Sequence, residues 1–555
     1  MLNIYQVLPR YVGNENSTRK PNGTIEENGC GKLKYINDNF LSYLSDCGYD
    51  AIWLTGVLMH ATKTDYSGFG IRIDHPGVVK GQAGSPYAIK DYYAIDPDLA
   101  TRPDKAMREF EEVVTKAHRK KIKVIIDFVP NHVARQYGSG LKHEGVRDLG
   151  SSDDTNMSFS PRNNFYYLPG QELRPQFDAQ QYYENPAKVS GNDVFSATPS
   201  INDWYETAKL NYGVDYQNGH SCHFTPTPDT WKKMTEILLY WAKKGVDGFR
   251  CDMAEMVPVE FWKYAIGKVK KQFPNIFFVA EVYNPQQYRD YIFRGGFDYL
   301  YDKVGLYDTL KAVTRHETSA NDITPRWQET DDIKTHMLNF LENHDEQRLA
   351  SDFVFADGYK AIPALVVSAL LNDSPFMVYF GQELGEQGMD SEGFSGRDGR
   401  TSIFDYWSMD SFNRLYARGE VNGLKLTEEE RELLVLYARV LQARKSIPAL
   451  GDGSYRFDLQ YLQDNNPDYN RHRCYAFARW KGNSRVLVIA NFDENGIGLA
   501  LNLNAELLKK MGIREGKNMR CRDLLTLRSW TESFSSKQPS RFQIDPYSAL
   551  VIEIK

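Results

Sequence analysis

The chain has 555 residues, and its 67 Lys and Arg against 73 Asp and Glu give a net charge of −6. A chain of this length forms more than one domain, and the lack of a basic excess argues against nucleic acid as a partner. No apolar run reaches the roughly 18 residues of a membrane span, so we expect no membrane segment. No signal peptide pattern is visible at the N-terminus, which predicts a cytoplasmic protein, or a periplasmic or secreted one if a leader has been removed.

Short apolar segments alternate with amphipathic helical segments along most of the chain, a pattern typical of repeated βα units around a parallel sheet. Seven such segments are clear and an eighth, at 299–304, is weaker. Eight strands would close a (β/α)8 TIM barrel of the α/β class. The other expected strands are 4–8, 51–54, 123–128, 248–253, 276–282, 335–341 and 376–380.

The remaining segments predict how the chain divides into domains. Residues 133–219 are too long for an ordinary βα loop and are rich in Gly, Ser, Asn, Asp and Tyr, so we expect an inserted subdomain after the third strand. Thr427 and Glu430 predict a capping box at the start of a helix that ends near residue 445. Strand-like segments at 474–480, 486–492 and 549–554 follow. We therefore predict a barrel at 1–132 and 220–445, and a C-terminal antiparallel β-sandwich domain at 446–555.

Polar side chains follow four of the predicted strands at their carboxyl ends, where a TIM barrel builds its site. They are Asp127, Asn131 and His132 after the third strand, Arg250 and Asp252 in the fourth, Glu281 in the fifth, and His344 and Asp345 after the seventh. Carboxylates that share one cleft push their pKa values apart, so that one is ionised while another holds a proton. Glycoside hydrolysis with two carboxyl groups requires this division of roles.

These four segments resemble the four signature regions of the α-amylase family, glycoside hydrolase family 13, in the family's order and at comparable spacing. The resemblance extends to the opening segment 4–10, the second strand, the insert and the C-terminal β domain. It implies that Asp252 is the nucleophile, Glu281 the general acid/base and Asp345 a third carboxylate that holds sugar hydroxyls. A retaining mechanism through a covalent glucosyl intermediate on Asp252 would follow.

The types of the neighbouring residues suit these roles. Arg250 lies two residues before Asp252, on the same face of the strand, and can keep that carboxylate ionised and oriented. Glu281 follows an apolar segment, and burial there would raise its pKa so that it can protonate the glycosidic oxygen.

Four further site residues are expected. The resemblance marks His132 and His344 as donors to hydroxyls of the reacting sugar, Asp127 as a supporting acid, and Tyr87 as the tyrosine that stacks on that sugar.

Calcium is the only metal that the resemblance suggests, and the chemistry itself requires no cofactor. Asn131 matches the position of a calcium ligand in the family, although a loop hydrogen bond explains this residue equally well. Lys32 stands where a second family calcium loop would supply a ligand, so we expect that second metal to be absent.

The sequence therefore predicts a retaining hydrolase of α-1,4-linked maltooligosaccharides, with an α-glucan as its partner. It does not predict the oligomeric state. A transglycosylase of the same family is the alternative, in which an acceptor sugar replaces water. A non-catalytic family member is disfavoured because Asp252, Glu281 and Asp345 are all present.

Overall fold

A computed structural model describes residues 1–140 and 147–555 of the chain. Within these residues, eight parallel strands form a closed barrel in the order β1-β2-β5-β12-β13-β14-β15-β16. The bounds are β1 Asn3–Val7, β2 Ala51–Leu54, β5 Lys123–Phe128, β12 Gly248–Cys251, β13 Phe277–Ala280, β14 Tyr299–Tyr301, β15 Met337–Phe340 and β16 Phe376–Tyr379. The predicted (β/α)8 barrel is confirmed, including its weakest strand at 299–304.

The alternation of side chains along each strand sorts the barrel into an inner and an outer core. In β13, Phe277 and Val279 belong to the cluster that fills the barrel interior, whereas Phe278 and Ala280 pack outward against the helices. In β12, Phe249 and Cys251 also belong to the outer cluster. The residue between them, Arg250, therefore points into the barrel.

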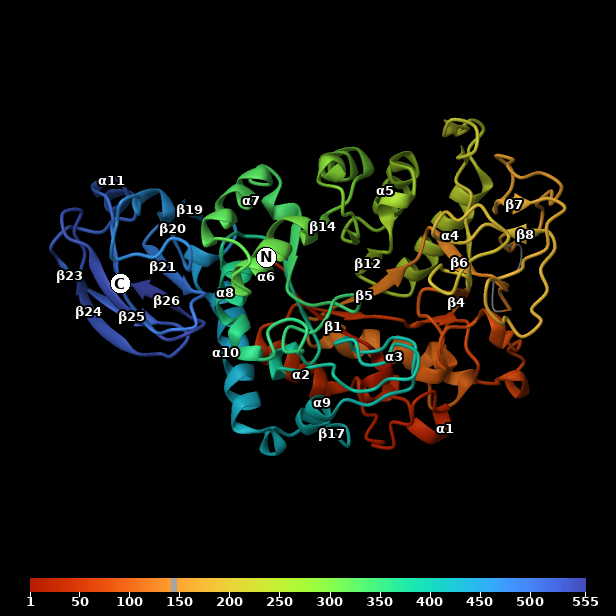
Figure 1. The fold of residues 1–555 in the computed structure, drawn as a ribbon, viewed down its shortest axis with the longest axis horizontal. Coiled ribbons are helices and arrows are strands. Elements are labelled where there is room, and N and C mark those ends of the chain that lie inside the picture. Colours follow the sequence, from red (N-terminus) through yellow and green to blue (C-terminus); the bar gives the residue numbers. More distant parts are fainter. Residues whose placement is uncertain (141–146) are drawn as a thin grey trace.

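Helices cover the outside of the barrel (Figure 1). The longer ones are α2 (Asp38–Cys47), α3 (Ala106–Arg119), α4 (Asp229–Lys243), α5 (Val259–Gln272), α8 (Ile362–Leu370) and α10 (Glu428–Ser446), and the shorter ones are α1 (Ile25–Asn28), α6 (Asp308–Thr314), α7 (Ile323–Glu329) and α9 (Asp410–Leu415). The predicted capping box of α10 is present, because Thr427 Oγ1 accepts a hydrogen bond from Glu430 N at 3.1 Å and Glu430 Oε2 accepts one from Thr427 N at 2.9 Å.

Short antiparallel strand pairs are added at the carboxyl ends of the barrel strands. One hairpin follows β2 and consists of β3 (Leu58–His60) and β4 (Ile89–Ile95). The long insert after β5 contains β6 (His132–Ala134), β7 (Tyr167–Leu168), β8 (Ala187–Lys188), β9 (Thr207–Lys209), β10 (Val214–Asp215) and β11 (Ser221–Cys222), while β17 (Tyr416–Ala417) pairs with β18 (Glu420–Val421). Figure 1 shows the insert in orange and yellow at the end of the molecule opposite the C-terminus. Residues 141–146 of the predicted insert lie outside the described part.

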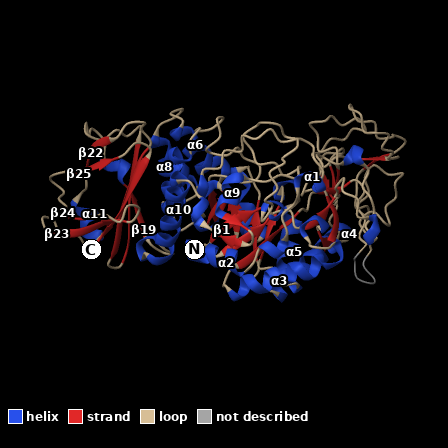
Figure 2. Ribbon diagram, turned by 90° about the horizontal axis from the view of Figure 1, so that it is seen from below, coloured by secondary structure: helices blue, strands red, loops and turns tan. Residues whose placement is uncertain are grey.

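The C-terminal strands form a separate domain (Figures 1 and 2). An antiparallel sheet has the order β19-β20-β21-β26-β23-β24, and β22 pairs with β25. Their bounds, with one helix, are β19 Tyr455–Asp458, β20 Cys474–Lys481, β21 Ser484–Asn491, β22 Ile497–Leu501, α11 Ala505–Lys510, β23 Asn518–Asp523, β24 Ser529–Ser533, β25 Ser540–Ile544 and β26 Ser548–Ile554. Leu499 and Phe542 from the pair share one core with Ile489 and Ile552 from the larger sheet. The predicted C-terminal antiparallel β domain is thereby confirmed.

Helix α8 contacts β21 and β26 and so joins the barrel to the C-terminal domain. Among the described residues, no helix is both long and apolar enough to span a lipid bilayer.

Candidate active site

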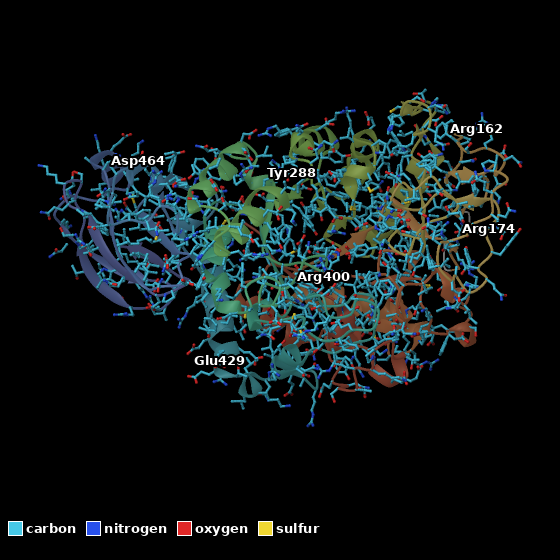
Figure 3. All side chains as sticks on the ribbon, viewed as in Figure 1. Arg162, Arg174, Tyr288, Arg400, Glu429 and Asp464 are labelled. Atoms are coloured by element: carbon cyan, nitrogen blue, oxygen red, sulfur yellow. The ribbon has the colours of Figure 1, made fainter. Side chains whose placement is uncertain are left out.

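The polar residues predicted from the strand ends converge on one cavity of about 280 Å³ at the carboxyl face of the barrel. Its lining includes Tyr87, His132, Asp252, Glu281 and Asp345. Arg250, Asp127 and His344 lie immediately behind these residues, as their contacts described below show. Arg400, whose Nε donates to the backbone oxygen of Asp345 at 2.8 Å, is near the middle of the molecule in Figure 3.

Arg250 holds the carboxylates of this cavity together. Its side chain is 1% exposed, its Nη1 donates to Asp252 Oδ1 at 2.6 Å, and its Nη2 lies 2.9 Å from Glu281 Oε2. Nη1 is also 3.6 Å from Asp127 Oδ1, and Nε donates to the Tyr301 hydroxyl at 3.0 Å. A buried guanidinium is stable only with such partners, and its planar fork orients both carboxylates.

Asp252 and Glu281 occupy different electrostatic environments. Burial raises the pKa of Asp252, Arg250 opposes that shift, and the charge of Glu281 raises the pKa further. Glu281 has two hydrogen-bond donors besides the Arg250 contact, since Met253 N donates to Oε2 at 2.8 Å and the Tyr283 hydroxyl donates to Oε1 at 2.6 Å. Both carboxylates contact one guanidinium, and the charge of Glu281 affects the protonation of Asp252.

The backbone around these two carboxylates is held in an unusual conformation. Met253, directly after Asp252, has a φ of 42°, a left-handed conformation that non-glycine residues rarely adopt, and its N–H points at Glu281. Glu255 Oε2 accepts hydrogen bonds from the backbone N–H groups of Tyr283 and Asn284, both at 3.1 Å. The β12 loop therefore positions the loop that carries Glu281 and Tyr283.

Asp345 faces the cavity with a 44% exposed side chain and contacts His344 at 3.1 Å. Although burial acts to raise its pKa, His344 and the nearby arginines lower the pKa of Asp345 to about 2. The His344 ring is fixed from both sides, because its Nδ1 lies 2.9 Å from Gln6 Nε2 and its Nε2 lies 2.6 Å from the Tyr87 hydroxyl. A charged Asp345 beside a fixed imidazole is suited to binding sugar hydroxyls.

His132 is buried in the opposite wall of the cavity. Burial lowers its pKa to about 3, and the charges of Lys209 and Lys80 act in the same direction. Its ring lies 5.1 Å from the half-buried ring of Trp204. At neutral pH the imidazole is therefore uncharged and can both donate and accept a hydrogen bond.

Asp127 is placed behind Arg250, as expected of a supporting acid. Its Oδ2 accepts hydrogen bonds from Trp53 Nε1 at 3.1 Å and Gly56 N at 3.3 Å, and its Oδ1 accepts one from the Tyr87 hydroxyl at 3.3 Å. Burial raises the pKa of Asp127, and Arg250 opposes that shift. Tyr87 stacks on the His344 ring, with 5.1 Å between the centroids and 22° between the planes.

Asn131 has other partners in the place where a calcium ion would bind. Its Oδ1 accepts a hydrogen bond from Lys209 Nζ at 2.8 Å, and its Nδ2 donates to Gly191 O at 2.7 Å. Lys209 also pairs with Asp193 at 2.5 Å and is 1% exposed. Calcium takes six to eight oxygen ligands, and no group of three or more His, Cys, Asp or Glu within the described residues could hold a metal. The residues around Asn131 therefore do not fit a calcium ion.

Several residues of the cavity were not predicted from the sequence. Tyr283 contacts Glu281 and follows β13, where only Glu281 was predicted as a site residue. Tyr301 contacts Arg250 and ends β14, where no site residue was predicted. Lys80, Trp204 and Glu206 also line the cavity or its wall. Lys80 comes from an irregular segment with no motif to indicate it. Trp204 and Glu206 belong to segment 204–213, whose match to a fifth family motif was too loose to assign roles. The two tyrosines could have been found from their places at strand ends.

The sequence matches the family model for the alpha amylase catalytic domain over residues 6–453. The chain belongs to the alpha-amylase family. It is therefore a glycoside hydrolase of this α-glucan-acting family. Alpha-amylase 3 of Dictyoglomus thermophilum is 24% identical over 497 residues, which cover 84% of this chain and 82% of that protein. Oligo-1,6-glucosidase of Heyndrickxia coagulans is 22% identical over 586 residues, which cover 89% of this chain and 92% of that protein.

The fold is also similar to that of a solved family structure. The crystal structure of a maltogenic alpha-amylase, AmyB of Thermotoga neapolitana, aligns over 100% of this chain and 98% of that one, with a TM-score of 0.63 and 19% identity. A structural likeness at 19% identity shows the fold alone and does not fix the substrate.

Proposed function

We propose that the protein is a retaining glycoside hydrolase that cleaves α-1,4-glucosidic bonds in starch-derived maltooligosaccharides. The observation that carries this proposal is the single guanidinium of Arg250 in contact with both Asp252, at 2.6 Å, and Glu281, at 2.9 Å. Retaining enzymes place their carboxyl groups about 5 Å apart, whereas inverting enzymes leave room for a water between them. Two carboxylates bridged by one guanidinium favour the shorter, retaining spacing.

In the first step, Glu281 donates its proton to the glycosidic oxygen while a carboxylate oxygen of Asp252 attacks the anomeric carbon. The bond from that carbon to the leaving sugar breaks, and a covalent glucosyl ester forms on Asp252. The step requires the protonation state in which Asp252 is charged and Glu281 is neutral. Arg250, whose Nη1 donates to Asp252 at 2.6 Å, stabilises the charged form of Asp252.

In the second step, Glu281 removes a proton from water, and the hydroxide oxygen attacks the anomeric carbon to release Asp252. The charged Asp345 and the fixed His344 hold hydroxyls of the distorted sugar through both steps. Tyr87 offers its ring beside His344, and His132 offers an uncharged imidazole on the other wall of the cavity.

The proposal is tested by a chromatographic time course of products from maltoheptaose. We expect shorter maltooligosaccharides, and we expect Asp252→Asn and Glu281→Gln each to lower kcat by at least about 10³-fold without loss of the fold. Circular dichroism and the melting temperature check the fold of each variant. A variant with near wild-type kcat would refute the role assigned to that residue.

The same time course separates the alternatives. Products longer than maltoheptaose would show a transglycosylase, in which an acceptor sugar displaces Asp252 faster than water does. A complete lack of turnover on maltooligosaccharides and on α-1,6-linked substrates would contradict the proposed hydrolysis.

A further inference from the structure

An ion pair lies in the wall of the catalytic cavity, away from the three carboxylates of the proposed mechanism. Lys80 Nζ is 3.2 Å from Glu206 Oε1, and both residues line the cavity together with Asp252 and Glu281. The two side chains are only 12% and 5% exposed. Charged groups are rarely buried to this extent unless they are paired or bind a ligand.

The pair is incompletely satisfied. Glu206 Oε2 is buried and has no hydrogen-bond partner among the described residues. Burial raises the pKa of Glu206, and Lys80 opposes that shift. An unpaired buried acceptor is costly unless a further group completes its hydrogen bonding.

The position of the pair in the barrel bears on which side of the cleaved glycosidic bond it lies. Lys80 belongs to the segment between β3 and β4, which follows β2, and its neighbour Phe404 belongs to the loop that follows β16. In the barrel order, β2 and β16 flank β1, which is opposite β13. Because β13 carries Glu281, the acid that protonates the leaving-group oxygen, Lys80 lies on the side of the retained sugar.

Three segments of the chain meet at the Lys80–Glu206 pair in the cavity wall. Ala83 N donates to Phe404 O at 3.0 Å, which joins the segment after β3 to the loop after β16. Gly81, with a φ of +63°, allows this approach, because a Cβ at its position would lie 2.2 Å from the Phe404 oxygen. The Lys80–Glu206 contact then joins both segments to the insert.

We propose that Lys80 and Glu206 form the end wall of the substrate site and bind hydroxyls at the non-reducing end of a short glucan. Lys80 donates to one hydroxyl, and Glu206 Oε2 accepts from another. A longer chain cannot pass this wall, so the enzyme removes short units from non-reducing ends. The cavity of about 280 Å³ is at the lower end of the usual range for ligand pockets, which agrees with a short retained segment. This inference rests on the proposed hydrolysis of α-glucans.

The test compares maltoheptaose with a maltoheptaoside whose terminal 4- and 6-hydroxyls are blocked by an ethylidene group. We expect the wild-type enzyme to cleave the blocked substrate at least about 100-fold more slowly, because blocked hydroxyls cannot bind in a site built to hydrogen-bond them. The first products from maltoheptaose should be one short sugar, released from the non-reducing end, and the remainder of the chain. Equal rates on both substrates would overturn the proposed wall and leave the proposed hydrolysis intact, whereas turnover of neither substrate would count against the hydrolysis itself.

Variants then connect the effect to the pair. The ratio compared is the cleavage rate of the blocked maltoheptaoside divided by that of maltoheptaose. Glu206→Gln and Lys80→Ala should each raise this ratio by about tenfold, because each removes one hydroxyl contact. Lys20→Ala is the matched control, since Lys20 forms a lysine–glutamate contact with Glu27 of 2.5 Å on the surface, outside the cavity, and should leave the ratio unchanged. A folded Glu206→Gln enzyme with the wild-type ratio would overturn the assignment. The wild-type comparison decides the question even if a variant does not fold.

Discussion

Two buried cations near the carboxyl ends of the barrel strands differ in what they contact. Arg250 lies among Asp127, Asp252 and Glu281, and two of these acids line the cavity. Lys209 contacts Asn131 and Asp193 and joins the insert to the loop after β5. The first cation therefore organises groups that can still react with a ligand, whereas the second completes the packing between two parts of the chain.

The comparison shows that burial of a charge does not by itself indicate a catalytic site. Both side chains are 1% exposed. What distinguishes Arg250 is that its partners are several carboxylates at a cavity, and their mutual repulsion raises the pKa of Asp252 in addition to the effect of burial. Among the described residues, Lys209 has one charged partner, Asp193, which is 39% exposed to water.

Substitution of Arg250 should have the largest effect on activity. Lysine at this position keeps the positive charge but cannot contact Asp252 and Glu281 at the same time. We expect Arg250→Lys to lower kcat by about 10²–10³-fold and Arg250→Met to lower the free energy of unfolding by about 3–5 kcal/mol, because the acids would lose their buried partner. Steady-state kinetics and urea unfolding measure the two effects. Near wild-type kcat in Arg250→Lys would disprove the bridging role.

Substitution of Lys209 should affect stability and leave catalysis nearly unchanged. In Lys209→Met the Asn131 oxygen loses its donor and Asp193 its partner, and water can solvate Asp193 only in part. We expect a loss of about 1–3 kcal/mol in the free energy of unfolding, with kcat within about threefold of wild type. Lys232→Met, an exposed position on α4, is the control and should be close to neutral. A large loss of kcat at full stability would assign Lys209 to the active site instead.

This difference also shows how far the sequence could predict the molecule. The barrel strands were predictable because short apolar segments that alternate with amphipathic helical segments can be recognised without knowing the contacts of distant residues. Asp252, Glu281 and Asp345 were predictable because strand ends of one barrel must meet, and the structure brings all three to one cavity. Their roles stay predictions.

The contacts of Lys209 and Lys80 were not predictable, because they depend on how an irregular insert folds back on the barrel. The partners of Glu281 were also not predicted. We expected burial and the nearby acids to determine its protonation, and the structure adds two hydrogen-bond donors, the Met253 N–H and the Tyr283 hydroxyl. These contacts depend on a left-handed residue and a loop conformation, which a strand pattern does not encode.

The pH dependence of activity should report the coupling between Asp252 and Glu281. Asp252 must be charged to attack, and its pKa is raised, so activity should fall as the pH decreases through a value above the ordinary 3.8. In Glu281→Gln one cause of the raised pKa is removed, so the acidic limb of the pH–rate profile should move to lower pH. An α-glucosyl or α-maltosyl fluoride, whose leaving group needs no protonation, allows this measurement in the variant. A limb that stays in place or moves upward would show that the two carboxylates are not coupled.

Removal of divalent metals should have the smallest effect. The Lys209 ammonium occupies the Asn131 oxygen that a calcium ion would use, and a bound metal would have to displace this buried charge at considerable cost. A ligand that binds only the folded state raises its stability in proportion to RT ln(1 + [L]/Kd). We therefore expect neither EDTA nor millimolar calcium to change the melting temperature or kcat, and we expect the same in Lys32→Ala. A stabilisation by calcium that persists in Lys209→Met would locate a metal elsewhere in the chain, whereas one that appears only in that variant would show that the lysine replaces the ion.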